Sequence, residues 1–142
     1  MFIRQDEIRP DDRYYWVTAN EDGSYTATPK ALEDREESDE NGNPLYVKVY
    51  NKETEQMEDT AERLVTKGLK SNHIAQVKHN TNTTLAQTDW YVIRKAERNV
   101  DIPAEVATYR AAVVSWANAT EAAILAVTTV EELKEINLGV SV

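Results

Sequence analysis

Two histidines are the most versatile side chains of this sequence, because imidazole can act as acid, base or metal ligand near neutral pH. His73 falls on the apolar stripe of an expected helix, and His79 follows six residues later. This spacing places two side chains on separate faces of a helix, unlike the i, i+4 pairs that bind metals. We therefore expect no shared metal site, and a small histidine-dependent enzyme is the less favoured alternative.

Other reactive constellations are also missing from the sequence. It contains no cysteine, which excludes disulfides, thiolate metal sites and cysteine nucleophiles. It has no Gly-x-Ser-x-Gly motif, and four glycines are too few for most nucleotide-binding folds. Residues 39–43 place a glycine at the fourth position rather than the sixth of a calcium loop, which indicates a turn. We expect no catalytic residue, no cofactor and no metal.

The charge of the chain limits its possible partners. A net charge of -9 disfavours binding to nucleic acid phosphates or to an anionic membrane, so a protein partner is expected. The acidic run at residues 33–40 is ordinarily a solvated loop or edge strand; an acidic mimic of DNA that binds or inhibits a host factor is the alternative. No apolar run is long enough to span a bilayer, and residues 1–7 do not resemble a secretory signal, so we expect a cytoplasmic protein.

The first fifty residues are expected to be extended. Residues 13–19 and 24–28 are rich in aromatic and β-branched residues and flank the turn sequence at 20–23, which predicts a β-hairpin. Residues 41–44 predict a further turn, and residues 45–50 alternate aliphatic side chains with Tyr and Lys, as a strand does.

From about Met57 the pattern changes to that of a helix extending to about residue 78. Apolar residues recur every four positions on one of its faces: Ala61, Val65, Leu69, His73 and Val77. A second helix is expected through Trp90 to about Arg98, with Asn99 as its end.

The strongest helix is expected to open at Ile102-Pro103, because proline is tolerated in a first helical turn. A seam with spacings of three and four predicts that it pairs with another helix: Val106, Tyr109, Val113, Trp116, Thr120, Ala123 and Val127. A second apolar strip is expected to widen its buried face: Ala107, Ala111, Val114 and Leu125. Residues 129–132 match the capping box of a short final helix.

The order of these elements predicts an α+β fold, because strands come first and helices second. We expect a small antiparallel β-rich part over residues 1–55, which docks onto a partner, and a helical part over residues 56–142. The helical part is expected to be a hairpin or coiled-coil-like, and to support the first part or oligomerise. Whether the helices pair within one chain or between chains is open.

The segment from Leu85 to Arg110 resembles the signature near the C-terminus of bacteriophage tail-fibre assembly proteins and related small tail proteins. The matching positions read L-x-x-T-D-W, I-P and Y-R: Leu85, Thr88, Asp89, Trp90, Ile102, Pro103, Tyr109 and Arg110. The resemblance implies a non-enzymatic protein that is either a virion structural or adaptor component or a tail-fibre assembly factor and chaperone. Its partner would be a tail or tail-fibre protein, in a homo-oligomer or symmetric assembly, and it would occupy the host cytoplasm during assembly and then, as a permanent component, the virion.

Five residues are the expected partner contacts: Trp16, Trp90, Tyr91, Tyr109 and Arg110. Trp, Tyr and Arg dominate the binding energy of many interfaces. The alternatives are that Trp90 fills the core and that Arg110 covers apolar surface with its stem while its charged head stays in water. The aromatic residues on both faces of the strand around Trp16 either pack on the helices or dock onto another chain.

Overall fold

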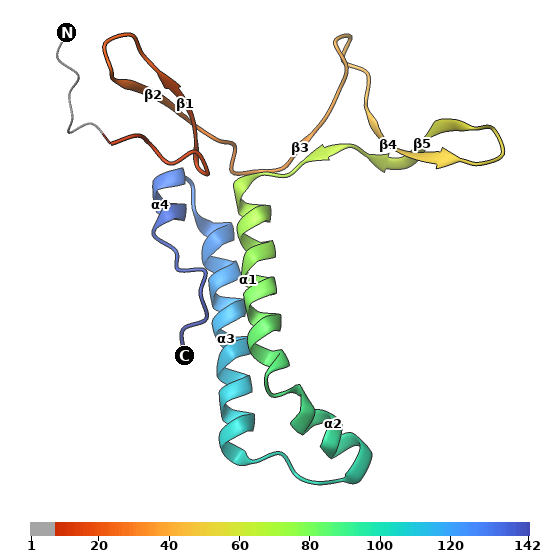
Figure 1. The fold of residues 1–142 in the computed structure, drawn as a ribbon, viewed down its shortest axis with the longest axis vertical. Helices are drawn as coiled ribbons and strands as arrows, with labels where there is room; N and C mark the ends of the chain where they lie inside the picture. Colours follow the sequence, from red (N-terminus) through yellow and green to blue (C-terminus); the bar gives the residue numbers. More distant parts are fainter. Residues whose placement is uncertain (1–7) are drawn as a thin grey trace.

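A computed structural model describes residues 8–142 and consists of two β-hairpin arms at one end of a helical stalk (Figure 1). Its strands are β1 (Tyr15–Ala19), β2 (Tyr25–Pro29), β3 (Arg35–Glu36), β4 (Tyr46–Asn51), β5 (Gln56–Arg63) and β6 (Val65–Thr66). Its helices are α1 (Leu69–Ala86), α2 (Asp89–Arg98), α3 (Ala104–Ala126) and α4 (Val130–Lys134). Strands precede helices, which confirms the α+β class. Residues 1–7, in which we expect no secretory signal, lie outside the described residues.

The first arm is the predicted hairpin of β1 and β2. The two strands pair antiparallel and place Trp16 opposite Thr28. The Asn20 N–H donates to the Ser24 carbonyl at 2.8 Å and closes the turn. Gly23 has a φ of +85°, a backbone conformation that glycine adopts without steric cost. The hairpin lies beside α4 at the upper end of the stalk (Figure 1).

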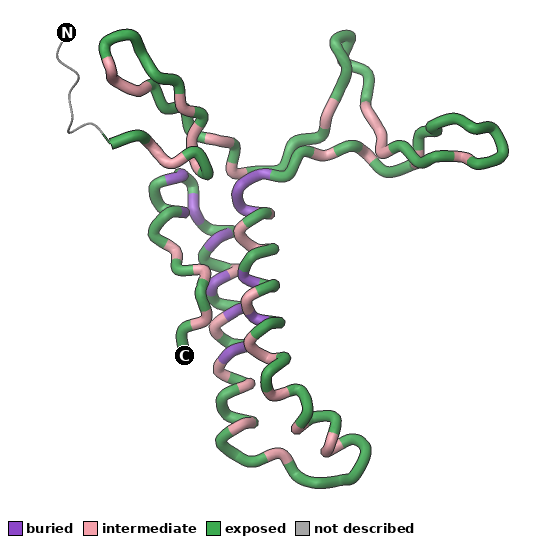
Figure 2. Tube along the Cα trace, viewed as in Figure 1, coloured by how far each residue is buried: buried purple, intermediate pink, exposed green. Residues whose placement is uncertain are grey.

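The second arm leaves the stalk through the short β3–β6 pair and ends in the longer β4–β5 hairpin. The strand predicted at residues 45–50 is confirmed as β4. The Asp39 carboxylate accepts hydrogen bonds from the backbone N–H groups of Asn41 and Asn43 at 2.8 and 2.9 Å, so this loop is the expected turn. In the described part of the chain before Gly68, no residue is buried (Figure 2).

The prediction of a helix that begins near Met57 is wrong for residues 57–68. Residues 56–63 form β5, which pairs with β4 and places Met57 opposite Tyr50. Both faces of this hairpin contact solvent, so β5 lacks the apolar and polar alternation of a half-buried strand. Ala61 and Val65 match a helical spacing but lie on β5 and β6, and the β-rich part extends to Thr66.

The first turn of α1 is completed by the loop at residues 31–34. The Asp34 carboxylate accepts hydrogen bonds from the Gly68 N–H at 2.8 Å and from the Ser71 hydroxyl at 2.6 Å. The next two N–H groups of α1 donate to the carbonyl oxygens of residues 31 and 32. A Cβ at position 68 would lie 2.4 Å from two carbonyl oxygens of this loop. The lack of a side chain at Gly68 therefore permits the loop to reach the helix end.

α1 and α3 pack antiparallel and form the stalk (Figure 1). The buried apolar residues lie at this contact and beneath α4: Leu69, Val77, Val113, Ala117, Ile124, Val127, Val130 and Leu133. The seam predicted for α3 is confirmed at Val113, Thr120 and Val127, whereas Tyr109 and Ala123 are exposed. The two long helices thus pair within one chain.

The second apolar strip of α3 does not belong to its buried face, contrary to the prediction. Ala107, Ala111, Val114 and Leu125 are all exposed, and Leu125 keeps 61% of its accessible surface. The reason is that α1 covers one side of α3, and the strip lies about a third of a turn away from that side.

The predicted ends of the shorter helices are confirmed. Asn99 ends α2 in the left-handed conformation with a φ of +56°. The Thr129 hydroxyl caps α4 by accepting from the Glu132 N–H at 3.2 Å. The chain then returns along the stalk, where the Asn80 amide donates to the Leu138 carbonyl at 2.8 Å.

Candidate interaction surfaces

The five predicted contact residues lie at two opposite ends of the molecule. Trp90, Tyr91, Tyr109 and Arg110 lie at the α2 end of the stalk, whereas Trp16 lies on β1 beside its other end (Figure 1). The structure therefore brings together four of the five residues.

Arg110 joins α3 to the connection between α1 and α2. Its guanidinium donates hydrogen bonds to the Leu85 carbonyl at 2.9 Å, the Thr88 hydroxyl at 2.7 Å and the Asp89 carboxylate at 2.9 Å. The Arg110 side chain is 21% exposed, so its guanidinium is held in this junction rather than lying free in solvent. Four residues that carry the family resemblance thus meet in one polar junction, which positions α2.

Trp90 lies on the surface at the start of α2. It keeps 51% of its accessible surface, so the alternative in which it fills the core is wrong. Its ring stacks on Tyr91 with centroids 3.7 Å apart. The Arg94 guanidinium lies 5.0 Å from the Trp90 ring and 5.3 Å from the Tyr91 ring, which adds a cation–π contact to each. These three side chains support one another without a buried neighbour on α2.

The α2 end presents an apolar surface to solvent. Large apolar residues exposed near this end of the stalk are Trp90, Val92, Ile93, Val100 and Tyr109. We call the part around Trp90 and Ile93 the α2-end surface. A shallow hollow of about 330 Å³ on it is lined by Trp90 and Ile93 together with Arg94, Glu97 and Arg98. Aromatic residues and arginines are the types enriched in protein interfaces. The α2-end surface therefore has the composition of a protein-binding site.

Trp16 forms a separate site on the first arm. Tyr14 and Tyr15, its neighbours, pack against the helical core, whereas Trp16 is 67% exposed. The Lys30 ammonium lies 4.5 Å from the centroid of the Trp16 ring. Both alternatives for this strand thus hold in part, because its tyrosines pack on the helices and its tryptophan faces outward. A hollow of about 360 Å³ beside Trp16 is bordered by four cationic side chains: Arg13, Lys30, Arg35 and Lys67.

A third exposed site, which the sequence pattern did not predict, lies on the β4–β5 hairpin. Val49, Tyr50 and Met57 are each more than half exposed, with Tyr50 and Met57 side by side across the two strands. The polar stretch at residues 51–56 could have predicted the turn of this hairpin. The apolar spacing that begins near Met57 favoured a helix instead. An isolated two-stranded hairpin is only marginally stable in water, so a covering partner would stabilise this arm.

Negative charge is concentrated in the β-rich half of the chain. Residues 1–68 contain 17 acidic and nine basic residues, a net charge of -8, whereas residues 69–126 contain five acidic and six basic residues, a net charge of +1. The α2-end surface thus lies on a nearly neutral body, and the arms are strongly acidic. The two ends would select chemically different partners.

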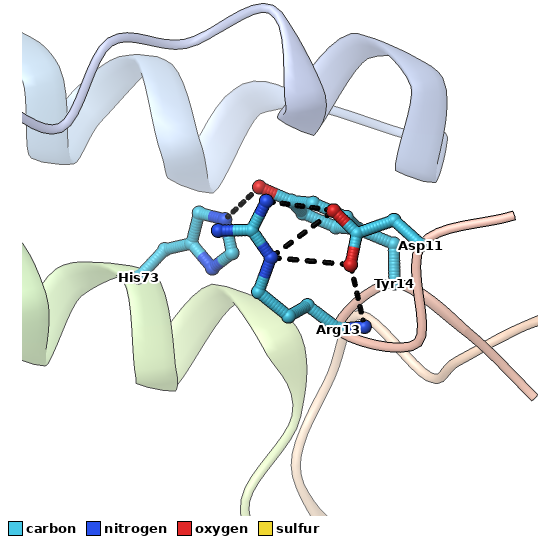
Figure 3. A network of polar contacts seen from close by, with 4 residues as sticks. All are labelled: Asp11, Arg13, Tyr14 and His73. Carbon is cyan, nitrogen blue, oxygen red and sulfur yellow. Dashed lines mark hydrogen bonds and ion pairs between the residues drawn. The ribbon is translucent and has the colours of Figure 1, made fainter.

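His73 belongs to a polar network that ties the segment before β1 to α1 (Figure 3). Its Nδ1 lies 2.9 Å from the Leu69 carbonyl and its Nε2 lies 3.4 Å from the Tyr14 hydroxyl. Burial lowers the pKa of His73 below its ordinary value of 6.5, and the positive charge of Arg13 acts in the same direction. Asp11 holds Arg13 in place, and its own pKa is lowered to about 2 by that pair. These contacts give the residues a structural role.

The described residues were also compared with the requirements of a metal site and of a membrane-spanning helix. Within residues 8–142, no three His, Asp or Glu side chains are close enough to share a metal ion. None of the helices in this range is long and apolar enough to cross a membrane. Comparisons with protein-family models, curated proteins and solved structures gave no match.

Proposed function

We propose that this chain is a non-enzymatic bacteriophage tail-associated protein that acts through protein–protein contacts. It would serve either as a virion structural or adaptor component or as a tail-fibre assembly factor, and its partner would be a tail or tail-fibre protein. The resemblance, which includes Leu85, Thr88, Asp89 and Arg110, supports this proposal, and the polar junction that these four residues share gives them a common role in positioning α2.

The single observation that carries a contact function is the exposure of large aromatic anchors at both ends of the molecule. Trp16 and Trp90 keep 67% and 51% of their accessible surface. Tryptophan buries a large apolar area at low entropic cost when a partner covers it. The proposed mechanism is burial of these anchors, while the acidic surface limits nonspecific association.

The first test is quantitative mass spectrometry of purified particles beside the infected-cell lysate from which they came. Presence at a fixed, symmetric copy number would indicate a virion component. Abundance in the lysate with absence from particles would indicate an assembly factor of the host cytoplasm. Absence from particles, together with normal particle assembly when the gene is deleted, would contradict the proposal.

A second test addresses the anchors. Particle assembly in cells that express Trp90→Ala or Trp16→Ala should fall, while Trp90→Phe should retain most activity because its ring still stacks on Tyr91. The matched control is Val142→Ala, since Val142 is 62% exposed but lies away from both anchors. Equal assembly by all these variants would contradict the anchor mechanism.

The charge distribution supports a second candidate function, an acidic protein that binds a basic host factor. The net charge of -8 on residues 1–68 is the observation that favours it. Such binding should weaken steeply between low and high salt, since exposed charges are screened within about 8 Å at physiological ionic strength. Binding through Trp90 and Ile93 would change little with salt.

A further inference from the structure

α3 is apolar on more sides than α1 covers. Its 23 residues include only three charged ones, Glu105, Arg110 and Glu121, yet only Val113, Ala117, Thr120 and Ile124 are buried. A helix that is apolar around most of its circumference is typical of a helix enclosed on several sides. In this chain one side remains uncovered.

The uncovered side has the spacing of a coiled-coil seam. We call it the α3 stripe, and it consists of Ala107, Ala111, Val114, Asn118 and Leu125. Successive members are separated by four, three, four and seven residues, which keeps them on one face of a helix. All five are exposed. Trp116, which packs against the core with Ile136 and Leu138, is two residues from both Val114 and Asn118 and so lies on the opposite side of α3.

A groove follows the α3 stripe between α1 and α3. One part, of about 490 Å³, is lined by Leu85, Arg110, Ala111, Val114, Ser115 and Asn118. A second part, of about 230 Å³, continues over Val114 and Asn118 toward Glu121. Small residues on the stripe allow a second helix backbone to approach closely.

We propose that the occupant of this groove is α3 of a second copy of the chain, packed antiparallel about a two-fold axis level with residue 116. Positions equidistant from residue 116 then face each other. Ala107 faces Leu125, so a large side chain fills the space above a small one. Val114 faces Asn118, and Ala111 faces Glu121, which lies at the edge of the stripe. A two-fold interface requires such self-complementarity, because the same patch is used by both chains.

The charge distribution selects the antiparallel direction. A parallel pair would bring together two β-rich halves that each carry a net charge of -8. An antiparallel pair separates them by about 34 Å, the length of a 23-residue helix, which is several times the screening length of about 8 Å. The five residues of the stripe are uncharged, whereas Arg110, Lys78 and Glu121 border the groove beside it.

The accessible surface of the chain is large enough to supply this interface. It measures 10609 Å², against about 7,400 Å² for a compact monomer of this 16.1 kDa mass. The excess of about 3,200 Å² exceeds the roughly 800 Å² that each partner contributes to a standard interface. The dimer therefore needs only part of the excess and leaves the arms and the α2-end surface open. It does not depend on a role in phage tails.

The decisive experiment is disulfide trapping in the full chain, which contains no native cysteine. An equimolar mixture of A107C and L125C is oxidised and analysed by mass spectrometry of the crosslinked dimers. The antiparallel arrangement predicts the mixed 107–125 disulfide, since bonding requires Cα atoms within about 7 Å. Crosslinks of A107C to itself and L125C to itself would instead indicate a parallel pair and overturn the proposal. The control is A123C, an exposed position two residues from Leu125 and therefore on the opposite side of α3, which should form no disulfide-linked dimer.

Sedimentation equilibrium between about 1 and 100 µM gives an independent readout. The unmodified chain should sediment at twice 16.1 kDa at the upper concentrations. Val114→Glu, on an exposed position, should weaken dimerisation at least about tenfold by burying a charge, with an unchanged circular dichroism spectrum. Ala123→Glu, at an exposed position on the opposite side of α3, should leave dimerisation unchanged. A monomer for the unmodified chain throughout, or equal effects of both variants, would overturn the proposal. Virion composition tests the proposed function separately.

Discussion

The Arg110 guanidinium lies 2.7 Å from the Thr88 hydroxyl, although the two residues are 22 positions apart. Through this contact and those to Leu85 and Asp89, α3 fixes the direction in which the chain leaves α1. The α2-end surface depends on this direction, because no residue of α2 is buried. The polar junction thus does the positioning that apolar packing does elsewhere in the stalk.

Arg110→Ala should lower the free energy of unfolding by about 2 kcal/mol, because three hydrogen bonds to one charged group are lost. Arg110→Lys should lose about 1 kcal/mol, since an ammonium cannot reach all three acceptors in the same fork. Urea denaturation measures both values, and amide exchange in α2 should accelerate. The control is Arg98→Ala at an exposed position of α2, with an expected change within about 0.5 kcal/mol. Equal effects at positions 98 and 110 would contradict the role of the junction.

Gly68→Ala should be strongly destabilising, by about 2 to 3 kcal/mol. The added methyl carbon would lie 2.4 Å from two backbone carbonyl oxygens of the loop at residues 31–34, which cannot rotate away as a side chain could. Thermal denaturation followed by circular dichroism checks this. Gly139→Ala is the matched control, because its nearest neighbour, the Asn137 side-chain oxygen, would be 3.4 Å away. Retention of full stability by Gly68→Ala would show that the loop is not closely packed there.

Stability should fall as the pH is lowered from 7 toward 5, in part through His73. Burial lowers the pKa of His73 in the folded chain below 6.5. As the pH falls, the unfolded chain therefore binds a proton at His73 before the folded chain does, which stabilises the unfolded state relative to the folded state. The contribution of His73 is complete above pH 6.5 and is lost as the pH falls through its folded pKa. His73→Gln should flatten this part of a stability–pH curve measured by urea denaturation. An unchanged curve for His73→Gln would refute the assignment.

Substitutions of Trp116 and Trp90 should affect different properties, the first the stability of the fold and the second partner binding. Trp116 packs against the core cluster, and Trp116→Ala should cost about 3 kcal/mol of unfolding free energy. Trp90 is half exposed, so Trp90→Ala should cost less than about 1 kcal/mol while it weakens partner binding. Calorimetric unfolding measures the first effect. A larger loss of stability for Trp90→Ala than for Trp116→Ala would contradict the placement of both residues.

Local signals in the sequence were enough to predict the elements that depend on local chemistry. The Asp22-Gly23 turn, the strand at residues 45–50, the left-handed Asn99 and the Thr129 cap each follow from one or two residues and are present in the structure. The order of strands and helices followed from them, and with it the α+β class.

Features that depend on contacts distant in sequence could not be predicted. β5 has no buried face, so nothing in its pattern distinguishes a strand from an exposed helix. The partners of Arg110 lie 21 to 25 positions earlier in the chain, and which side of α3 is covered depends on where α1 packs. Whether Trp90 lies in the core or on the surface also depends on such distant contacts, so the sequence left both alternatives open.

The pairing of Arg35 with Thr66 closes the second arm into a module whose two ends lie side by side. Between them the chain makes an excursion that contributes no buried residue to the stalk. Because loop-closure entropy grows slowly with length, this stretch can be lengthened, shortened or grafted from another protein at small cost to the helices. The stalk can therefore keep its own packing while the stretch between residues 35 and 66 is exchanged for one of different length.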